Sequence, residues 1–251
     1  MLRWQSAVFL AFTFCLPSVS AQERNVEKLA PVPFVGCKSD GQQGPQDAPA
    51  AAGVVEVEAG SASKLAYYDS QNGPGVLAPR GWYCFGTYGS AGSHLFVSPE
   101  PVPQKSLFSS DWKGFTGPAI QADSMSGGTS GRFGVARIIA RVFPAYQEFA
   151  RQVIAEGFEP AANFPFGPYP NDQLIYKSDH VVEYRTPPQT DGLGTASWLQ
   201  KNDDGIGGVA ILKGPETYLV KLTLRLPADQ RGLESPIIDQ FEKAWIDRPD
   251  H

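Results

Sequence analysis

Candidate acid–base residues are few in this chain of 251 residues. Of its three histidines, His251 is terminal, so His94 and His180 are the side chains that could act as a general base. His180 follows Asp179 at the start of a predicted strand, and His94 lies at the edge of a predicted hairpin. The G-x-S-x-G pattern of serine hydrolases is absent, because Tyr88 takes the first position of the nearest match. We expect each histidine to make a cross-strand hydrogen bond rather than to catalyse a reaction.

Carboxylates could also do chemistry, since a glycosidase needs two of them at a defined separation. The candidates by residue type are Asp69, Asp111, Asp179 and Glu183. The sequence does not give the separation of their carboxyl groups, and we expect most of them to be solvated surface charges. A secreted hydrolase that uses carboxylates or His180 is kept as the alternative function.

Two glycine-containing patterns lie in the wrong context for the ligands they suggest. Residues 205–210 fit the dinucleotide pattern G-x-G-x-x-A, but a strand is predicted after them, where that site needs a helix. Residues 202–205 are similar to part of a calcium loop, but Gln200 and Ile211 occupy its first and last positions and supply no carboxylate. We therefore expect no cofactor and no metal site, with a weak surface calcium site as the alternative.

An aromatic loop is the feature that core packing explains least. Residues 163–170 carry Phe164, Phe166 and Tyr169 on a proline-stiffened backbone that loses little entropy on binding. These aromatics are candidate ligand-binding residues for a glycan or a peptide. The alternative is that the rings fill a gap between helix and sheet, because aromatic side chains are usually buried.

The N-terminus predicts export. Arg3 precedes an apolar run at residues 7–16, and small residues at 19–21 are typical of a signal-peptidase site after Ala21. The run is too short to span a bilayer, and no later run approaches membrane length. We expect a signal peptide at residues 1–21, no membrane anchor after cleavage, and a periplasmic or secreted protein.

The charge and the cysteine content limit which class of partner and which cellular compartment are expected. The formal net charge is −5 and no cluster of Lys and Arg offsets it, so a nucleic-acid partner is not expected. Cys15 would leave with the signal peptide, and Cys37 and Cys84 remain. Two thiols in an oxidising compartment predict one disulfide. Free or metal-binding thiols are the alternative, but no second Cys or His stands at ligand spacing.

Apolar periodicity predicts one long helix in the second half of the chain. Apolar residues from Val135 to Val153 recur every three or four positions, and Pro144 requires a kink or a restart there. The opposite side of this helix carries Arg137, Arg141 and Arg151, and with Arg132 these residues are the only concentration of positive charge in the sequence. These arginines could bind an anion, although a solvated helix face also accounts for them.

Strand patterns surround that helix. Residues 81–88 and 94–97 predict a hairpin, and residues 123–131 a loop of small residues. Short strands follow at 174–176, 180–185, 208–213 and 217–226, with a short strand also at Trp198–Leu199. The last helix should begin near Pro236 with Ser235 as its N-cap.

Together these patterns predict an α+β fold. An antiparallel β meander is packed with the kinked amphipathic helix and the C-terminal helix on one face, and a β-rich, disulfide-linked N-terminal half precedes it. The expected segments are the signal peptide, an extended Pro/Ala/Gly-rich arm at 22–52, a β-rich segment at 53–128 and an α+β segment at 129–251. The last two could share one core.

Non-catalytic binding, or an association with the cell envelope, is the expected function. A deep pocket gathering Asp179, His180 and other polar groups would favour the hydrolase, and a shallow aromatic surface would favour binding.

Overall fold

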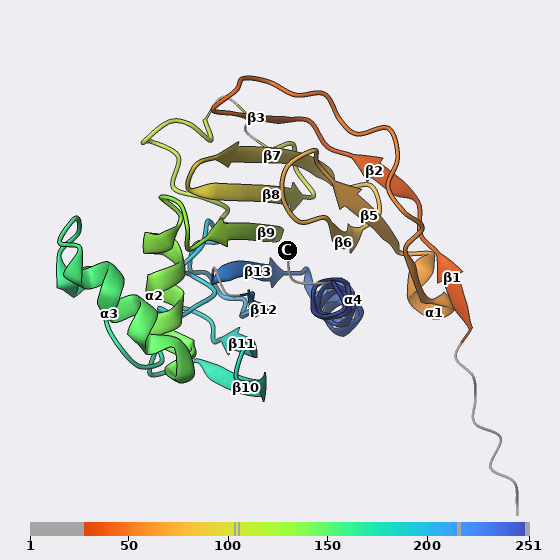
Figure 1. Ribbon diagram of the computed structural model, residues 1–251. Coiled ribbons are helices and arrows are strands. Elements are labelled where there is room, and N and C mark those ends of the chain that lie inside the picture. The colour runs from red at the N-terminus through yellow and green to blue at the C-terminus, as the bar shows by residue number, and fades with distance from the viewer. Residues whose placement is uncertain (1–27, 103, 105, 215–216, 249–251) are drawn as a thin grey trace, which may run out of the picture.

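A mostly antiparallel sheet of eight strands forms the centre of the molecule (Figure 1). The computed structural model describes residues 28–102, 104, 106–214 and 217–248, so the expected signal peptide lies outside the described residues. In spatial order the strands are β10 (Gln173–Ser178), β11 (Val181–Thr186), β12 (Ile206–Lys213), β13 (Tyr218–Arg225), β9 (Ala119–Ser126), β8 (Gly92–Ser98), β7 (Tyr83–Gly89) and β3 (Ser39–Gly41). Only the β3–β7 pair in this sheet is parallel. The predicted α+β class, hairpin and meander are confirmed.

Both faces of this sheet are covered. One face packs against α2 (Arg132–Val142) and α3 (Gln147–Ala155), and the other against α4 (Glu234–Ile246). A three-stranded sheet of β2 (Phe34–Gly36), β5 (Leu65–Asp69) and β6 (Val76–Pro79) lies on the α4 side. The expectation that both helices share one face is therefore wrong.

The physical reason lies in the strands. Neighbouring side chains of a strand point to opposite faces. Val209 and Ile211 of β12 enter the core on the α4 side, and Ala210 and Leu212 enter the core on the α2 side. An apolar strand of this kind needs cover on both faces.

The long predicted helix is broken at the proline, as its chemistry requires. The α2 helix stops before Phe143, and Pro144–Tyr146 form a 3₁₀ turn from which α3 starts. Proline has no N–H to donate to the preceding turn, so it takes the first position of a new helical segment.

Three local expectations are corrected. Asp123 does not begin a loop, because residues up to Ser126 belong to β9, a strand in the interior of the sheet. Ser235 is not the N-cap of α4, since the 3₁₀ turn Ala228–Leu233 runs directly into that helix. At Trp198–Leu199 the structure has an isolated bridge between Leu199 and Phe115 rather than a strand.

The N-terminal arm runs along the outside of the molecule in short strands. β1 (Leu29–Pro31) pairs with β4 (Glu56–Glu58), which leads into the short helix α1 (Ala59–Ala62). Between β2 and β3, Cys37 forms the predicted disulfide with Cys84 of β7. No helix among the described residues is long and apolar enough to cross a membrane.

Candidate functional site

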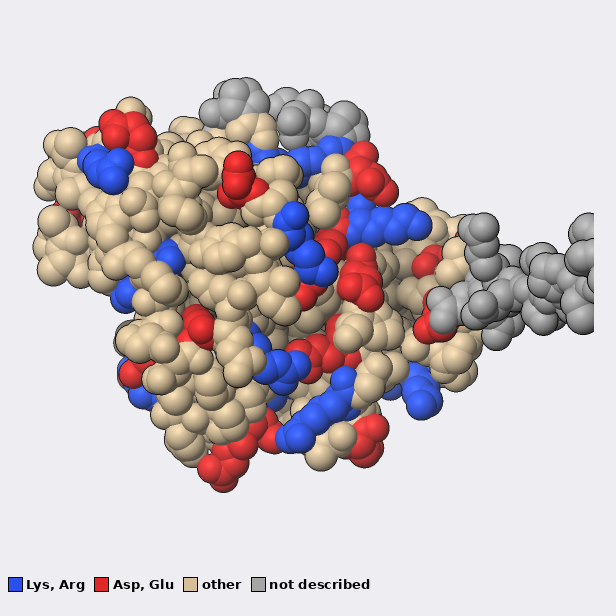
Figure 2. Space-filling view, turned by 90° about the horizontal axis from the view of Figure 1, so that it is seen from below, with Lys and Arg blue, Asp and Glu red and all other residues tan. Residues whose placement is uncertain are grey.

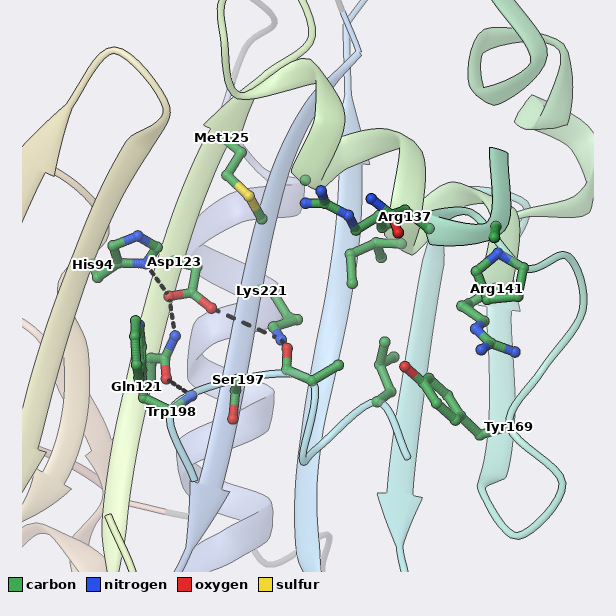
Figure 3. A pocket seen from close by; sticks show the side chains of 17 residues that line it. His94, Gln121, Asp123, Met125, Arg137, Arg141, Tyr169, Ser197, Trp198 and Lys221 are labelled. Carbon is green, nitrogen blue, oxygen red and sulfur yellow. Dashed lines mark hydrogen bonds and ion pairs between the residues drawn. The ribbon is translucent and has the colours of Figure 1, made fainter. Parts of the chain in front are cut away.

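Strand register places three ionisable side chains in one row on the α2 side of the sheet. His94 of β8 lies opposite Asp123 of β9, and Asp123 lies opposite Lys221 of β13 (Figure 3). Side chains directly across from each other in a sheet point to the same face, so the three functional groups meet.

Asp123 is the buried centre of this row, with 2% of its surface exposed. His94 Nδ1 lies 2.7 Å from its Oδ1, Gln121 Nε2 donates to the same oxygen at 2.6 Å, and Lys221 Nζ lies 4.0 Å from Oδ2. Burial alone would raise the pKa of Asp123. The hydrogen bond and charge of His94 and the charge of Lys221 outweigh burial and hold the pKa below its usual value. Asp123 is therefore an ionised carboxylate, and His94 Nδ1 donates to it.

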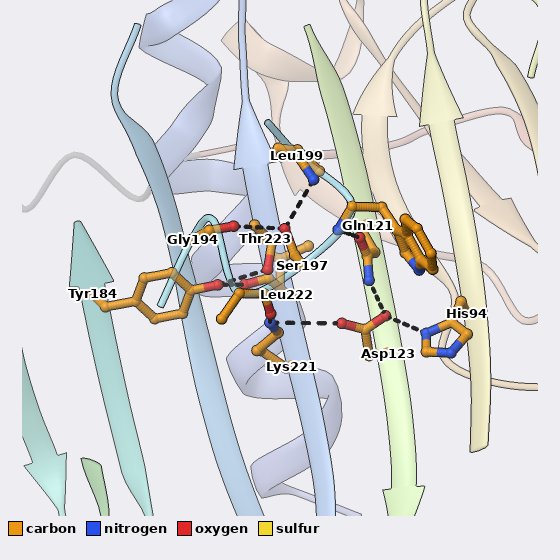
Figure 4. Close-up of polar contacts among 12 residues, drawn as sticks. His94, Gln121, Asp123, Tyr184, Gly194, Ser197, Leu199, Lys221, Leu222 and Thr223 are labelled. Carbon is orange, nitrogen blue, oxygen red and sulfur yellow. Dashed lines mark hydrogen bonds and ion pairs between the residues drawn. The ribbon is translucent and has the colours of Figure 1, made fainter. Parts of the chain in front are cut away.

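Lys221 is as deeply buried as its partner. Its Nζ donates to the carbonyl of Ala196 at 2.9 Å. Burial lowers the pKa of Lys221, and the charge of Asp123 opposes that shift. The backbone N–H of Trp198 donates to Gln121 Oε1 at 2.8 Å. These two bonds tie the loop at residues 193–199 to the polar row of the sheet (Figure 4).

A second polar contact supports the sheet beside this row. The hydroxyl groups of Tyr184 and Thr223 lie 2.7 Å apart, and the Tyr184 hydroxyl donates to the carbonyl of Leu222 at 2.9 Å. The ring of Tyr184 crosses β12 at Gly208, where a Cβ would lie 2.5 Å from the tyrosine oxygen. Glycine is therefore required at this close approach.

A pocket of about 520 Å³ opens above the row, between the sheet, α2 and two loops. Its lining residues are His94, Gln121, Asp123, Met125, Gly134, Arg137, Ile138, Arg141, Ala162, Asn163, Pro165, Tyr169, Leu193, Ala196, Ser197, Trp198 and Lys221. Gly134 lets α2 approach β9, because a Cβ there would lie 2.5 Å from the sulfur of Met125. The volume is typical of a small-molecule site.

Two arginines of α2 form the positive wall of the pocket. Arg137 is paired with Glu159, which also accepts a hydrogen bond from Asn163. Arg141 is half-buried, its guanidinium carbon lies 4.0 Å from the ring centroid of Tyr169, and its Nη1 donates to the carbonyl of Gly167 at 3.1 Å. No carboxylate among the described residues forms an ion pair with Arg141.

The structure separates the three predicted ligand-binding aromatics. Tyr169 lines the pocket, whereas Phe164 is 2% exposed and belongs to the core between α2 and the sheet. Phe166 is 45% exposed and lies outside the pocket, with Arg151 5.7 Å from its ring. Only Tyr169 of the three is placed where it could touch a ligand in this pocket.

Apart from His94, the candidate acid–base residues lie outside the pocket. Asp179 and His180 are exposed in the turn between β10 and β11, where His180 Nδ1 lies 3.3 Å from Ser178 Oγ. Asp69 is half-buried at the end of β5, and Asp111 is exposed in a separate loop. Of the two candidate histidines, only His94 makes a cross-strand bond and lines a cavity.

Glu183 instead joins an acidic cluster with Asp239 and Glu242 of α4, whose carboxylate oxygens lie within 4.8 Å of one another. Lys177 pairs with Glu183 at 2.7 Å. Acidic and basic side chains are interspersed on the face that contains the β10 edge of the sheet (Figure 2). Burial, followed by the hydrogen bond and charge of Glu183, raises the pKa of Glu242 to about 7.

The raised pKa of Glu242 predicts a pH-dependent gain in stability for Glu242→Gln. Folded Glu242 keeps a proton that the unfolded chain releases between pH 4.5 and about 7, so its contribution to stability falls as pH rises through this window. Near pH 8 the variant should be more stable than wild type by about 1 kcal/mol, after discounting for partial solvent exposure, and near pH 4 the two should match. Urea unfolding at both pH values measures this. Glu148→Gln, at an exposed position on α3, is the control, and a variant destabilised at both pH values would contradict the assignment.

The sequence did not point to Asp123 or Lys221 as site residues. The signal for Asp123 was the alternation in residues 119–126, where Ile120 and Ala122 enter the core on the α4 side and Gln121 and Asp123 face the pocket. The polar residues interrupt the apolar run, which concealed an interior strand. In the sequence Lys221 stands on the same side of its strand as Thr223 and Arg225, and only the fold shows that this polar side is buried.

Comparisons with known proteins do not assign this chain to a family. No family model, no curated protein and no solved structure matches the chain.

Proposed function

We propose that this protein binds a small carboxylate in the pocket between the sheet and α2, and that binding rather than catalysis is its function. The single observation that carries the proposal is Arg141, a half-buried guanidinium on the wall of a 520 Å³ pocket. Guanidinium has five N–H donors, and among the described residues only the carbonyl of Gly167 accepts one from Arg141. Its remaining donors suit the two oxygens of a carboxylate.

The one acid in the pocket lining does not compete for this role. Asp123 is satisfied by His94, Gln121 and Lys221, so it is neutralised within the sheet. The nearby Asp172 is engaged by the Thr186 hydroxyl and the Leu193 N–H. Burial raises the pKa of Asp172 and the charge of Arg141 opposes that shift, but the two form no ion pair, so the donors of Arg141 that do not bond to Gly167 are left for a ligand.

Replacement of Arg141 tests this function. A panel of aliphatic and aromatic monocarboxylates, each paired with its neutral primary amide, is titrated by calorimetry against the whole protein. At least one acid should bind and its amide should not. Arg141→Ala should weaken the binding of that acid by about 10- to 100-fold, because charge-assisted hydrogen bonds contribute about 1.5–3 kcal/mol.

Arg151→Ala is the matched control, since Arg151 is an exposed arginine that does not line the pocket. It should bind as wild type does. The proposal is contradicted if no acid in the panel binds, if the amides bind equally well, or if Arg141→Ala leaves the affinity unchanged.

A hydrolase is the second candidate function. Its general base would be His94 rather than His180. His94 is oriented by a buried carboxylate beside a cavity, which is the arrangement of a general base and its positioning acid. Ser197, the serine of the pocket lining, donates to the carbonyl of Gly194 at 2.5 Å and accepts from the N–H of Leu199 at 3.1 Å. No described serine or cysteine contacts His94, which favours binding. Turnover of p-nitrophenyl esters that is lost in His94→Gln would favour the enzyme instead.

Export to a periplasmic or extracellular location is part of the same proposal. The disulfide between Cys37 and Cys84 supports an oxidising compartment. The mass of the protein isolated from its native cells tests export. Loss of residues 1–21 would support it, and a full-length cytosolic protein would contradict it.

A further inference from the structure

We infer that the carboxylate ligand carries a planar aromatic ring, which stacks on Trp198. This inference rests on the proposed carboxylate binding and goes further by naming the chemistry of the ligand's body. Trp198 lines the pocket and is 37% exposed, although it is a large apolar side chain. Such exposure beside a cavity is unusual for tryptophan and marks a surface available to a ligand.

Trp198 is held in place before any ligand arrives. Its backbone N–H donates to Gln121 and its carbonyl accepts from the N–H of Phe115 at 2.6 Å. The rings of Trp198 and Trp112 stack with centroids 4.9 Å apart and planes inclined by 26°. Trp112 in turn packs edge-on against Phe115, with centroids 5.3 Å apart. A ring fixed in this way loses little entropy when a second ring stacks on it.

The other aromatic ring of the pocket lining is already engaged. The guanidinium of Arg141 lies 4.0 Å from the ring centroid of Tyr169, which occupies that face of the ring. Tyr169 therefore positions Arg141, while Trp198 is the aromatic surface left to contact a ligand. The pair of Arg141 and Tyr169 lies at one side of the pocket and Trp198 at the opposite side, with Lys221 and Ser197 between them (Figure 3).

The lining between these two sides suits an apolar ring. Ile138 and Met125 contribute apolar surface, and the polar groups below them are satisfied within the sheet. A volume of about 520 Å³ accommodates a ring together with an acidic group. The arrangement therefore fits an aromatic acid with its ring on Trp198 and its carboxylate at Arg141.

Three acids with similar rings but different faces test the inference. 4-Phenylbutyrate joins a planar ring to its carboxylate by a three-carbon chain that can reach across the pocket, 4-cyclohexylbutyrate has the same carbon count without a π face, and glucuronate represents a sugar acid. Each is titrated by calorimetry into the whole protein and into Trp198→Ala, Trp198→Phe and Phe166→Ala. Phe166 is the control because it is exposed and lies outside the pocket.

4-Phenylbutyrate should bind about tenfold more tightly than 4-cyclohexylbutyrate, in line with the strength of aromatic pairs. Trp198→Ala should remove this preference, Trp198→Phe should keep most of it, and Phe166→Ala should leave it unchanged. The preference is the ratio of two affinities measured on the same protein variant. A loss of stability in that variant lowers both affinities and does not mimic the result.

The outcomes distinguish this inference from the function on which it rests. Equal binding of 4-phenylbutyrate and 4-cyclohexylbutyrate, or a preference that survives Trp198→Ala, overturns the aromatic ligand and leaves carboxylate binding intact. Tighter binding of glucuronate than of 4-phenylbutyrate replaces the aromatic acid with a sugar acid. Failure of all three acids and of the wider panel overturns the carboxylate function itself.

Discussion

Asp123→Ala should lower the free energy of unfolding by about 3–5 kcal/mol, the range expected when one partner of a buried ion pair is removed. The substitution leaves the buried ammonium group of Lys221 without its carboxylate, and it leaves Gln121 and His94 without the oxygen that they share. Lys221 has 2% of its surface exposed, so water cannot solvate it in place. Urea unfolding measures the effect as a lower midpoint at an unchanged slope.

The double variant Asp123→Ala/Lys221→Met separates this cause from simple loss of volume. Removing both charges should recover part of the loss, because an apolar replacement of a whole buried pair is often close to neutral. Asp111→Ala is the control, since this acid is exposed and does not line the pocket. A loss below about 1 kcal/mol for Asp123→Ala, or a double variant less stable than the single one, would contradict the buried pair.

Removing the disulfide with Cys37→Ala/Cys84→Ala should also have a large effect. The bridge closes a loop with a sequence separation of 47 residues, which predicts a loss of about 4 kcal/mol from chain entropy alone. On either side of Cys37 the backbone pairings are short, because β2 and β3 are three residues each and pair in parallel with their neighbours.

Urea unfolding and hydrogen exchange measure this second effect together. Exchange should rise first at residues 34–41, which the bridge holds against β5 and β7. Wild type in the presence of reductant is the matched control and should approach the double variant. An unchanged midpoint, with β2 and β3 still protected, would show that the bridge does not stabilise the arm.

Local chemistry in the sequence determined several features of this protein. Only two cysteines follow the expected signal peptide, so the partners of the disulfide were fixed by count. Pro144 lacks a backbone N–H, so the helix break was fixed by one residue. The alternation from Tyr218 to Leu226 identified β13, because a strand with one apolar side needs no knowledge of its neighbours.

Other features were decided by the tertiary structure alone. The row of His94, Asp123 and Lys221 depends on the register between three strands far apart in the chain. Sequence patterns record which side chains share a face of one strand, but not which strands become neighbours. The same limit concealed the burial of Arg225, whose guanidinium donates to the carbonyls of Phe115, Gly117 and Gln200 from loops that only the fold brings together. The hydropathy of arginine predicts that such a side chain is exposed to solvent. Hydrogen bonds to its guanidinium group allow it to be buried instead.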